Sequence, residues 1–271
     1  MVTSPSRGPA LAKAVADRTG EIVRALRGLD ERELRGPTAL DGWSRLTVAC
    51  HLRHGAKALS RMALDGLAGR PTYYYPAGRE HERPATLAPS AGETPLEVVD
   101  SLVAHSEQLQ RVWGSLDASD WELTVREPDD NPDLGPLPLV RLPLMRLTEV
   151  EVHGTDLGLG LNDWSSLFVD VALPFRLDRL NMRRTNHRHV DGRVQGSWLL
   201  VATDGPVYLV TVAGSETCTS TADVNASASA VIEGTSRDLL ALLLGRPAAA
   251  PLKITGDQVV AASFSQAFPG P

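Results

Sequence analysis

Glu149 and His153 form the pair of residues that most constrains how this chain folds. They lie four residues apart in segment 144–153, whose leucines and valines recur with a helical period. On a helix with 3.6 residues per turn, positions i and i+4 lie one above the other on the same face. A carboxylate in such an apolar helix needs a partner of opposite charge, and a metal ion is one such partner. The alternatives are a surface salt bridge or a histidine satisfied in the core.

His51 is the best candidate for a third metal ligand, with His54 as the reserve. It lies in segment 43–52, which also has a helical apolar pattern. Two neutral imidazoles and one carboxylate suit zinc and leave one coordination position for a reacting group. Structural zinc is normally closed by four protein ligands, so the set His51, Glu149 and His153 predicts a catalytic site.

The composition indicates a globular protein that acts on small molecules. The 271 residues are 42% hydrophobic and 22% charged, without an apolar run long enough to cross a bilayer. Lys and Arg number 27 against 33 Asp and Glu, and the net charge of −6 disfavours nucleic-acid and anionic-membrane partners. The N-terminus lacks an apolar signal region, and Cys50 and Cys218 are too few for a disulfide framework. We therefore expect a cytoplasmic protein.

Residues 1–160 predict four helices. The first ends at Gly28, and the third starts at Thr94, where Glu97 completes a capping box. The long connection 73–84 between the second and third helices has no helical period and opens with three tyrosines. Four helices joined by long connections favour a bundle whose interior hosts a metal. The expected helices cover about residues 11–27, 46–67, 95–112 and 144–153.

Residues 161–271 predict a small α+β domain. After a helical stretch at 163–184, two strand-like runs flank an Asp-Gly turn in segment 197–212. A further strand at 228–232 precedes a capped apolar helix at 235–246. The expected fold class is therefore α+β, with an N-terminal bundle at 1–160 and an α+β domain at 161–271.

Several spaced motifs resemble the mycothiol-dependent maleylpyruvate isomerase family. Trp43 stands eight residues before His51, as in that family. The last bundle helix of the family carries the pattern Arg, Glu, His and Asp-Leu, which here is Arg146, Glu149, His153 and Asp156-Leu157. An arginine after a Tyr-Pro turn, a helix that ends in Gly-Arg and a later Gly-Asp turn also match, at Arg79, Gly245-Arg246 and Gly256-Asp257.

The resemblance implies a DinB-like metal-binding four-helix bundle followed by a small α/β domain that closes the active-site cleft. It implies that the metal, zinc or another divalent ion, activates the low-molecular-weight thiol mycothiol for attack on a small organic electrophile. Arg79 and Arg246 would then be catalytic and hold a carboxylate or oxyanion. Helix-end charge compensation is the other explanation for Arg246. The hydroxyls of Tyr73, Tyr74 and Tyr75 would bind mycothiol.

Two reactions stay open at this point. Expulsion of a leaving group would give an S-transferase, whereas rotation about a former double bond followed by loss of the thiol would give a cis-trans isomerase. The alternatives from other classes are a non-enzymatic ligand-binding protein with a structural metal and a hydrolase that uses metal-bound water. Asp156 has two possible roles, either to orient His153 or to cap its own helix.

Overall fold

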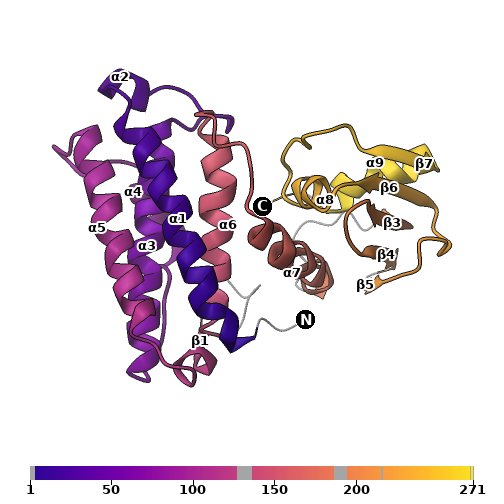
Figure 1. Ribbon diagram of the computed structural model, residues 1–271, viewed down its shortest axis with the longest axis horizontal. Helices are drawn as coiled ribbons and strands as arrows, with labels where there is room; N and C mark the ends of the chain where they lie inside the picture. Colours follow the sequence, from indigo (N-terminus) through magenta and orange to yellow (C-terminus); the bar gives the residue numbers. More distant parts are fainter. Residues whose placement is uncertain (1–3, 127–135, 186–193, 215, 269, 271) are drawn as a thin grey trace. The chain divides into compact units, whose positions relative to one another are not determined.

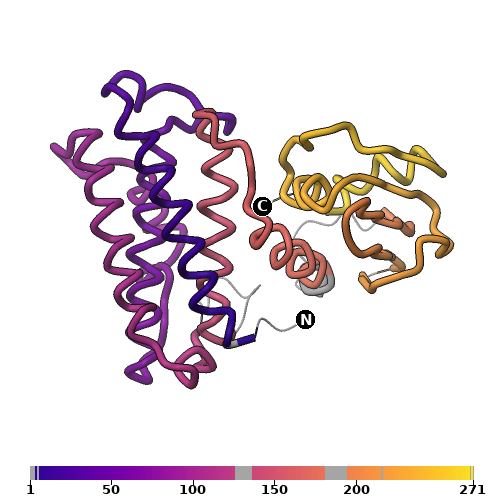
Figure 2. Tube along the Cα trace, viewed as in Figure 1, coloured from indigo at the N-terminus to yellow at the C-terminus, as the bar shows by residue number. Residues whose placement is uncertain are grey.

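The computed structural model describes residues 4–126, 136–185, 194–214, 216–268 and 270. The chain divides into two compact units, Val2–Phe168 and Val169–Pro271, which are described separately below. Figure 2 follows the course of the chain through both of them. Within the described ranges, no helix has the length and apolar character needed to span a membrane.

The first unit is a bundle of four long helices, as predicted (Figure 1). Helix α1 packs on α5 and α6, and α3 packs on the same two helices. The four helices are α1 (Gly8–Arg27), α3 (Arg45–Leu67), α5 (Pro95–Gly114) and α6 (Arg141–Asp156). Their buried faces meet in an apolar interior that includes Leu11, Ile22, Leu26, Leu52, Leu59, Leu102 and Leu147.

The ends of these helices follow from local side-chain chemistry. The hydroxyl of Thr94 accepts a hydrogen bond from the Glu97 amide, and the Glu97 carboxylate accepts one from the Thr94 amide, which is the predicted capping box. Ser44 caps α3 through the Thr47 amide. Gly28 ends α1 at the position that the sequence indicates.

Several short elements of the first unit were not predicted. The absence of a helical period in segment 73–84 was misleading, because α4 (Arg79–Thr86) begins there. This helix of two turns has no buried residue, so it carries no apolar stripe that the sequence would reveal. The others are η1 (Pro5–Arg7), α2 (Glu31–Leu34), η2 (Asp120–Glu122), β1 (Thr124–Arg126) and its antiparallel partner β2 (Pro136–Pro138).

The second unit contains a sheet with the strand order β5-β4-β3-β6-β7. Strands β3 and β6 are parallel, and the other pairs are antiparallel. Helices α8 and α9 both pack on β3 and β6. The elements are α7 (Ser166–Thr185), which crosses the boundary between the units, β3 (Gly196–Ala202), β4 (Val207–Ala213), β5 (Glu216–Thr221), β6 (Ala230–Gly234), α8 (Ser236–Leu243), β7 (Lys253–Gly256) and α9 (Gln258–Ala267).

An aromatic cluster anchors α9 to the sheet. Trp198 of β3 is fully buried and makes edge contacts with Phe264 and Phe268. Its ring nitrogen donates a hydrogen bond of 2.7 Å to the carbonyl of Val260. The two units together confirm the expected α+β class.

Candidate metal centre

The loop before α3 is tied to the end of α6, and this places His51. The amide of Ala39 donates to the carbonyl of Asp156 at 2.9 Å. Nε of Arg45 donates to the carbonyl of Leu157 at 3.1 Å. The start of α3 therefore lies beside the end of α6, and His51, in the second turn of α3, faces the last turns of α6.

The structure brings His51, Glu149 and His153 together. Nε2 of His51 lies 2.7 Å from Oε2 of Glu149, and Nε2 of His153 lies 3.4 Å from the same oxygen. All three ligand atoms lie within 4.8 Å of one another. The i,i+4 spacing on α6 accounts for the shared face of Glu149 and His153, and the loop contacts account for the approach of His51.

These three side chains fit a divalent cation. Tetrahedral zinc with ligand bonds near 2.1 Å separates its ligand atoms by roughly 3.4 Å, so the observed separations require only small side-chain rotations. Side-chain exposure is 11% for His51 and 13% for His153, but 41% for Glu149. The site is therefore buried on its histidine side, and the side chain of Glu149 is its most exposed part.

The electrostatics of the three groups suit metal binding. Burial lowers the pKa of His51 despite its hydrogen bond to Glu149, so this ring is neutral near pH 7. Burial alone would raise the pKa of Glu149, but hydrogen bonds with His153 and His51 hold it well below the ordinary value. For His153, burial is outweighed by hydrogen bonds to Asp156 and Glu149, which raise its pKa to about 9. Metal binding would therefore displace a proton from His153.

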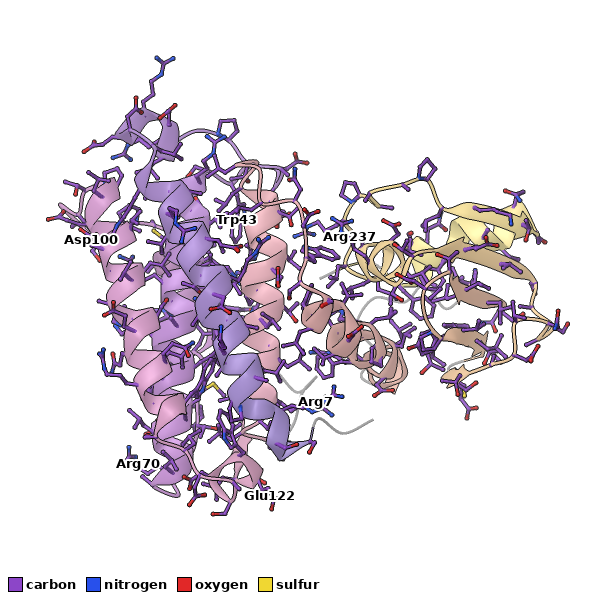
Figure 3. The ribbon with its side chains drawn as sticks, viewed as in Figure 1. Arg7, Trp43, Arg70, Asp100, Glu122 and Arg237 are labelled. Carbon is purple, nitrogen blue, oxygen red and sulfur yellow. The ribbon has the colours of Figure 1, made fainter. Side chains whose placement is uncertain are left out.

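Asp156 and Trp43 support the two histidines. Oδ2 of Asp156 lies 2.9 Å from Nδ1 of His153, and because an ionised carboxylate only accepts, Nδ1–H donates. This arrangement would leave Nε2 of His153 free to bind a metal, which fits an orienting role for Asp156. The ring of Trp43 stacks on His153 with a centroid distance of 5.9 Å and meets His51 edge-on at 5.5 Å. Figure 3 labels Trp43 in the bundle.

The three tyrosines differ in their surroundings. Tyr73 is 39% exposed, Tyr74 is half-buried and Tyr75 is buried. The ring of Tyr75 stacks on His54 at a centroid distance of 4.9 Å. His54 is thus engaged with the tyrosines, and it does not belong to the cluster that could hold a metal. Binding of mycothiol by the tyrosine hydroxyls stays a prediction.

The predicted catalytic arginines lie in different units. Arg79 opens α4 with its guanidinium 5.9 Å from the centroid of the Tyr75 ring. Arg246 belongs to the second unit, where its amide donates to the carbonyl of Ala241 after Gly245 leaves α8 with a φ of 64°. The catalytic roles of both residues stay predictions.

Arg83 is a residue near the site that was not predicted from the sequence. This residue lies one helical turn after Arg79 in α4, and it is close enough to His51 for its charge to help lower the pKa of that ring. The overlooked signal was the i,i+4 spacing of the two arginines, which becomes informative only once segment 79–86 is known to be helical.

The described residues form a helical bundle with a His-Glu-His cluster that could hold a metal ion, followed by a small α+β unit. Residues 15–158 match the family described as mycothiol maleylpyruvate isomerase N-terminal domain, and the chain belongs to this family. Membership in it indicates an enzyme, an isomerase, as opposed to a ligand-binding protein.

The fold is shared with two solved structures. One is a crystal structure of the mycothiol-dependent maleylpyruvate isomerase, and the other is a histidine-to-alanine mutant of that enzyme. Both are 16% identical to this chain and cover 94% of it and 96% of their own length, with TM-scores of 0.68 and 0.69. No curated protein sequence matches the chain.

Proposed function

We propose that this enzyme uses mycothiol and a divalent metal to isomerise a small unsaturated acid of the maleylpyruvate type. Zinc is the metal that we propose. The observation that carries the proposal is the convergence of His51, Glu149 and His153 within the bundle of a chain that belongs to this family. The ligand set of two imidazoles and one carboxylate is that of catalytic zinc sites.

The residues of the bundle prepare the site for this chemistry. When bound, the metal would lower the pKa of the mycothiol thiol, whose reversible addition to a carbon–carbon double bond allows cis-trans rotation. Asp156 fixes the tautomer of His153, and Trp43 holds the planes of both histidine rings. The exposed edge of Glu149 marks the side from which thiol and substrate would enter.

The chain does not supply the nucleophilic sulfur itself. Cys50 is fully buried, and this burial raises the pKa of its thiol to about 11. A thiol with so high a pKa is a poor nucleophile near neutral pH. The second cysteine, Cys218, is exposed on the edge strand β5, and we propose that it takes no part in the reaction. An external thiol is therefore part of the proposal.

We further propose that the remaining predicted residues act on the substrate and thiol. Arg79 and Arg246 would hold a carboxylate or oxyanion by charge-assisted hydrogen bonds. Tyr73, Tyr74 and Tyr75 would offer hydroxyls to the sugar oxygens of mycothiol. The domain that starts near residue 161 would close the active-site cleft and bring Arg246 to it.

The test combines elemental analysis of the purified protein with an assay of maleylpyruvate isomerisation in the presence and absence of mycothiol. We expect one zinc per chain and turnover only with mycothiol. Consumption of the thiol with each turnover would indicate an S-transferase instead. Full turnover without any thiol would refute the proposal and favour a metal-bound water as the nucleophile.

A further inference from the structure

Arg146 carries a buried positive charge without a hydrogen-bond partner among the described residues. It lies three residues before Glu149 on α6, and only 1% of its surface is exposed. None of its three side-chain nitrogens makes a hydrogen bond within the described ranges. Burial of a guanidinium without hydrogen-bond partners is unfavourable, and for Arg146 the loss of hydration outweighs the attraction of Glu149, so its pKa is lowered. The geometry therefore points to a ligand that completes this site.

Gly55 provides the space in which Arg146 and Tyr74 meet. A Cβ atom at Gly55 would lie 2.8 Å from Nη1 of Arg146 and 3.1 Å from the hydroxyl oxygen of Tyr74. Any side chain at position 55 would therefore displace one of these groups. Gly55 lies one helical turn after His51 on α3, so this meeting point is adjacent to the candidate metal centre.

A second guanidinium, that of Arg83, lies within electrostatic range of Tyr74. Arg83 is half-buried, and its charge acts on both Tyr74 and His51. Arg146 acts on Tyr74 as well, so the phenol lies within range of two arginines. The charge of Glu149 acts on the same phenol in the opposite direction. The two guanidinium groups place positive charge beside the metal ligands.

The ring of His54 lies 5.3 Å from the ring of Tyr74 and is neutral near pH 7. Burial is the main reason that its pKa is lowered to about 4, and the charges of Arg61, His51, Lys57 and Arg53 lower it further. This imidazole therefore adds no positive charge of its own. A cluster of positive charges with low-dielectric walls attracts anions.

We propose that Arg146, Tyr74 and Arg83 form a carboxylate-binding subsite next to the metal centre. Arg146 forms its buried end, and the half-buried Tyr74 and Arg83 form its outer part. A guanidinium and a phenol both donate to carboxylate oxygens, the former by two parallel hydrogen bonds. Given the proposed function, on which this step rests, the subsite binds one carboxylate of the unsaturated acid and holds its double bond toward the metal-bound thiol.

The test measures the binding of maleate, a small cis-dicarboxylate, to the zinc-loaded protein by isothermal titration calorimetry. Tyr74→Phe removes one donor with little change in shape, and Arg146→Lys keeps the charge but loses the planar fork. We expect each to raise the dissociation constant for maleate roughly tenfold or more, because a hydrogen bond to a charged group is lost. Arg83→Gln should have a similar effect. Arg70→Gln, at an exposed arginine paired with Asp65, is the matched control and should change nothing.

Zinc content and thermal unfolding are measured for every variant. If Arg146→Lys does not fold, Gly55→Ala and Tyr74→Phe still test the subsite, since the methyl group at position 55 would intrude on both donors. Unchanged affinity for maleate in folded Tyr74→Phe and Gly55→Ala proteins would overturn the proposal. The proposal would also be overturned if Arg146→Lys lost zinc but its zinc-loaded fraction bound maleate with unchanged affinity. Arg146 would then only position the metal ligand Glu149. Weaker maleate binding in an enzyme without mycothiol-dependent isomerisation would refute the proposed function and leave the subsite standing.

Discussion

Replacement of Asp156 by Asn tests how the metal centre is held in place. The carboxylate of Asp156 is 2% exposed and accepts a hydrogen bond of 2.9 Å from Nδ1 of His153. Asparagine keeps an oxygen that accepts this hydrogen bond but removes its negative charge. Loss of a carboxylate that orients a metal-binding histidine lowers metal affinity roughly 10- to 100-fold, which corresponds to about 1.4–2.8 kcal/mol. We therefore expect Asp156→Asn to weaken zinc binding within this range.

The pKa of His153 gives a second measurement for the same substitution. Asp156 makes the largest contribution to raising this pKa to about 9. The pKa of His153 should therefore be lower in Asp156→Asn, which an NMR titration of the metal-free protein would measure. In the wild-type protein near pH 7 the ring is protonated, and zinc must displace that proton. Zinc affinity should therefore rise as pH increases toward 9 and then level off. In the variant it should level off at a lower pH.

Affinity for zinc is measured by competition with a chromophoric chelator, both near neutral pH and above the pKa of His153. Above that pKa, proton competition is absent from both proteins, so the remaining difference reports the orientation of the ring. Asp100→Asn is the control, because this exposed carboxylate on α5 pairs with Arg27 (Figure 3). Equal zinc affinities of folded Asp156→Asn and wild-type proteins above pH 9 would refute the orienting role.

Three further predictions concern other parts of the chain. Cys50→Ser and Cys218→Ser should keep most of the mycothiol-dependent activity, and its loss in either folded variant would contradict an external thiol. Arg246→Ala should lower kcat/KM roughly tenfold or more with unchanged zinc content, as expected for a residue that contacts substrate. If Arg246→Ala fails to fold, the result would favour the other role of Arg246, which is to compensate the charge at the end of its helix. Thr94→Ala breaks the capping box of α5 and should lower the free energy of unfolding by about 1 kcal/mol, or the Tm measured by calorimetry by roughly 2–4 °C. An unchanged Tm would show that the cap does not stabilise α5.

The sequence revealed the long helices because each buries a stripe of apolar residues. Burial of one face imposes the helical period on the side chains, and the same constraint applies to every helix of the bundle. The helix-capping residues Gly28 and Thr94 could also be predicted, because a cap interacts only with backbone groups a few residues away. In the second unit, β3, β4 and β6 bury at least alternate residues and were predicted for the same reason.

Elements that bury little left no comparable pattern. Strand β7 is exposed at all of its positions, and α4 has no buried residue. Strand β5 also lies at an edge of the sheet and alternates between half-buried and exposed side chains without a fully buried one. Such elements are fixed by hydrogen bonds to a neighbour or by the turns before them, and these partners are distant in sequence. This is why Arg83, which lies on α4, did not stand out beside Arg79.

Some residues of the candidate site are positioned by local helix geometry, and others are positioned by contacts with residues distant in the sequence. Glu149, His153 and Asp156 lie within a segment of eight residues. Helical geometry alone therefore places Glu149 and His153 on one face and brings Asp156 to the Nδ1 side of the ring. His51 joins them only because the hydrogen bonds of Ala39 and Arg45 tie the start of α3 to the end of α6. The charge of Arg146 was visible in the sequence, but its burial without hydrogen-bond partners among the described residues was not, because that depends on packing against residues far away in the sequence, such as Gly55 and Tyr74. The feature that distinguishes a substrate-binding arginine from a structural one is therefore a property of packing, and it becomes visible only in three dimensions.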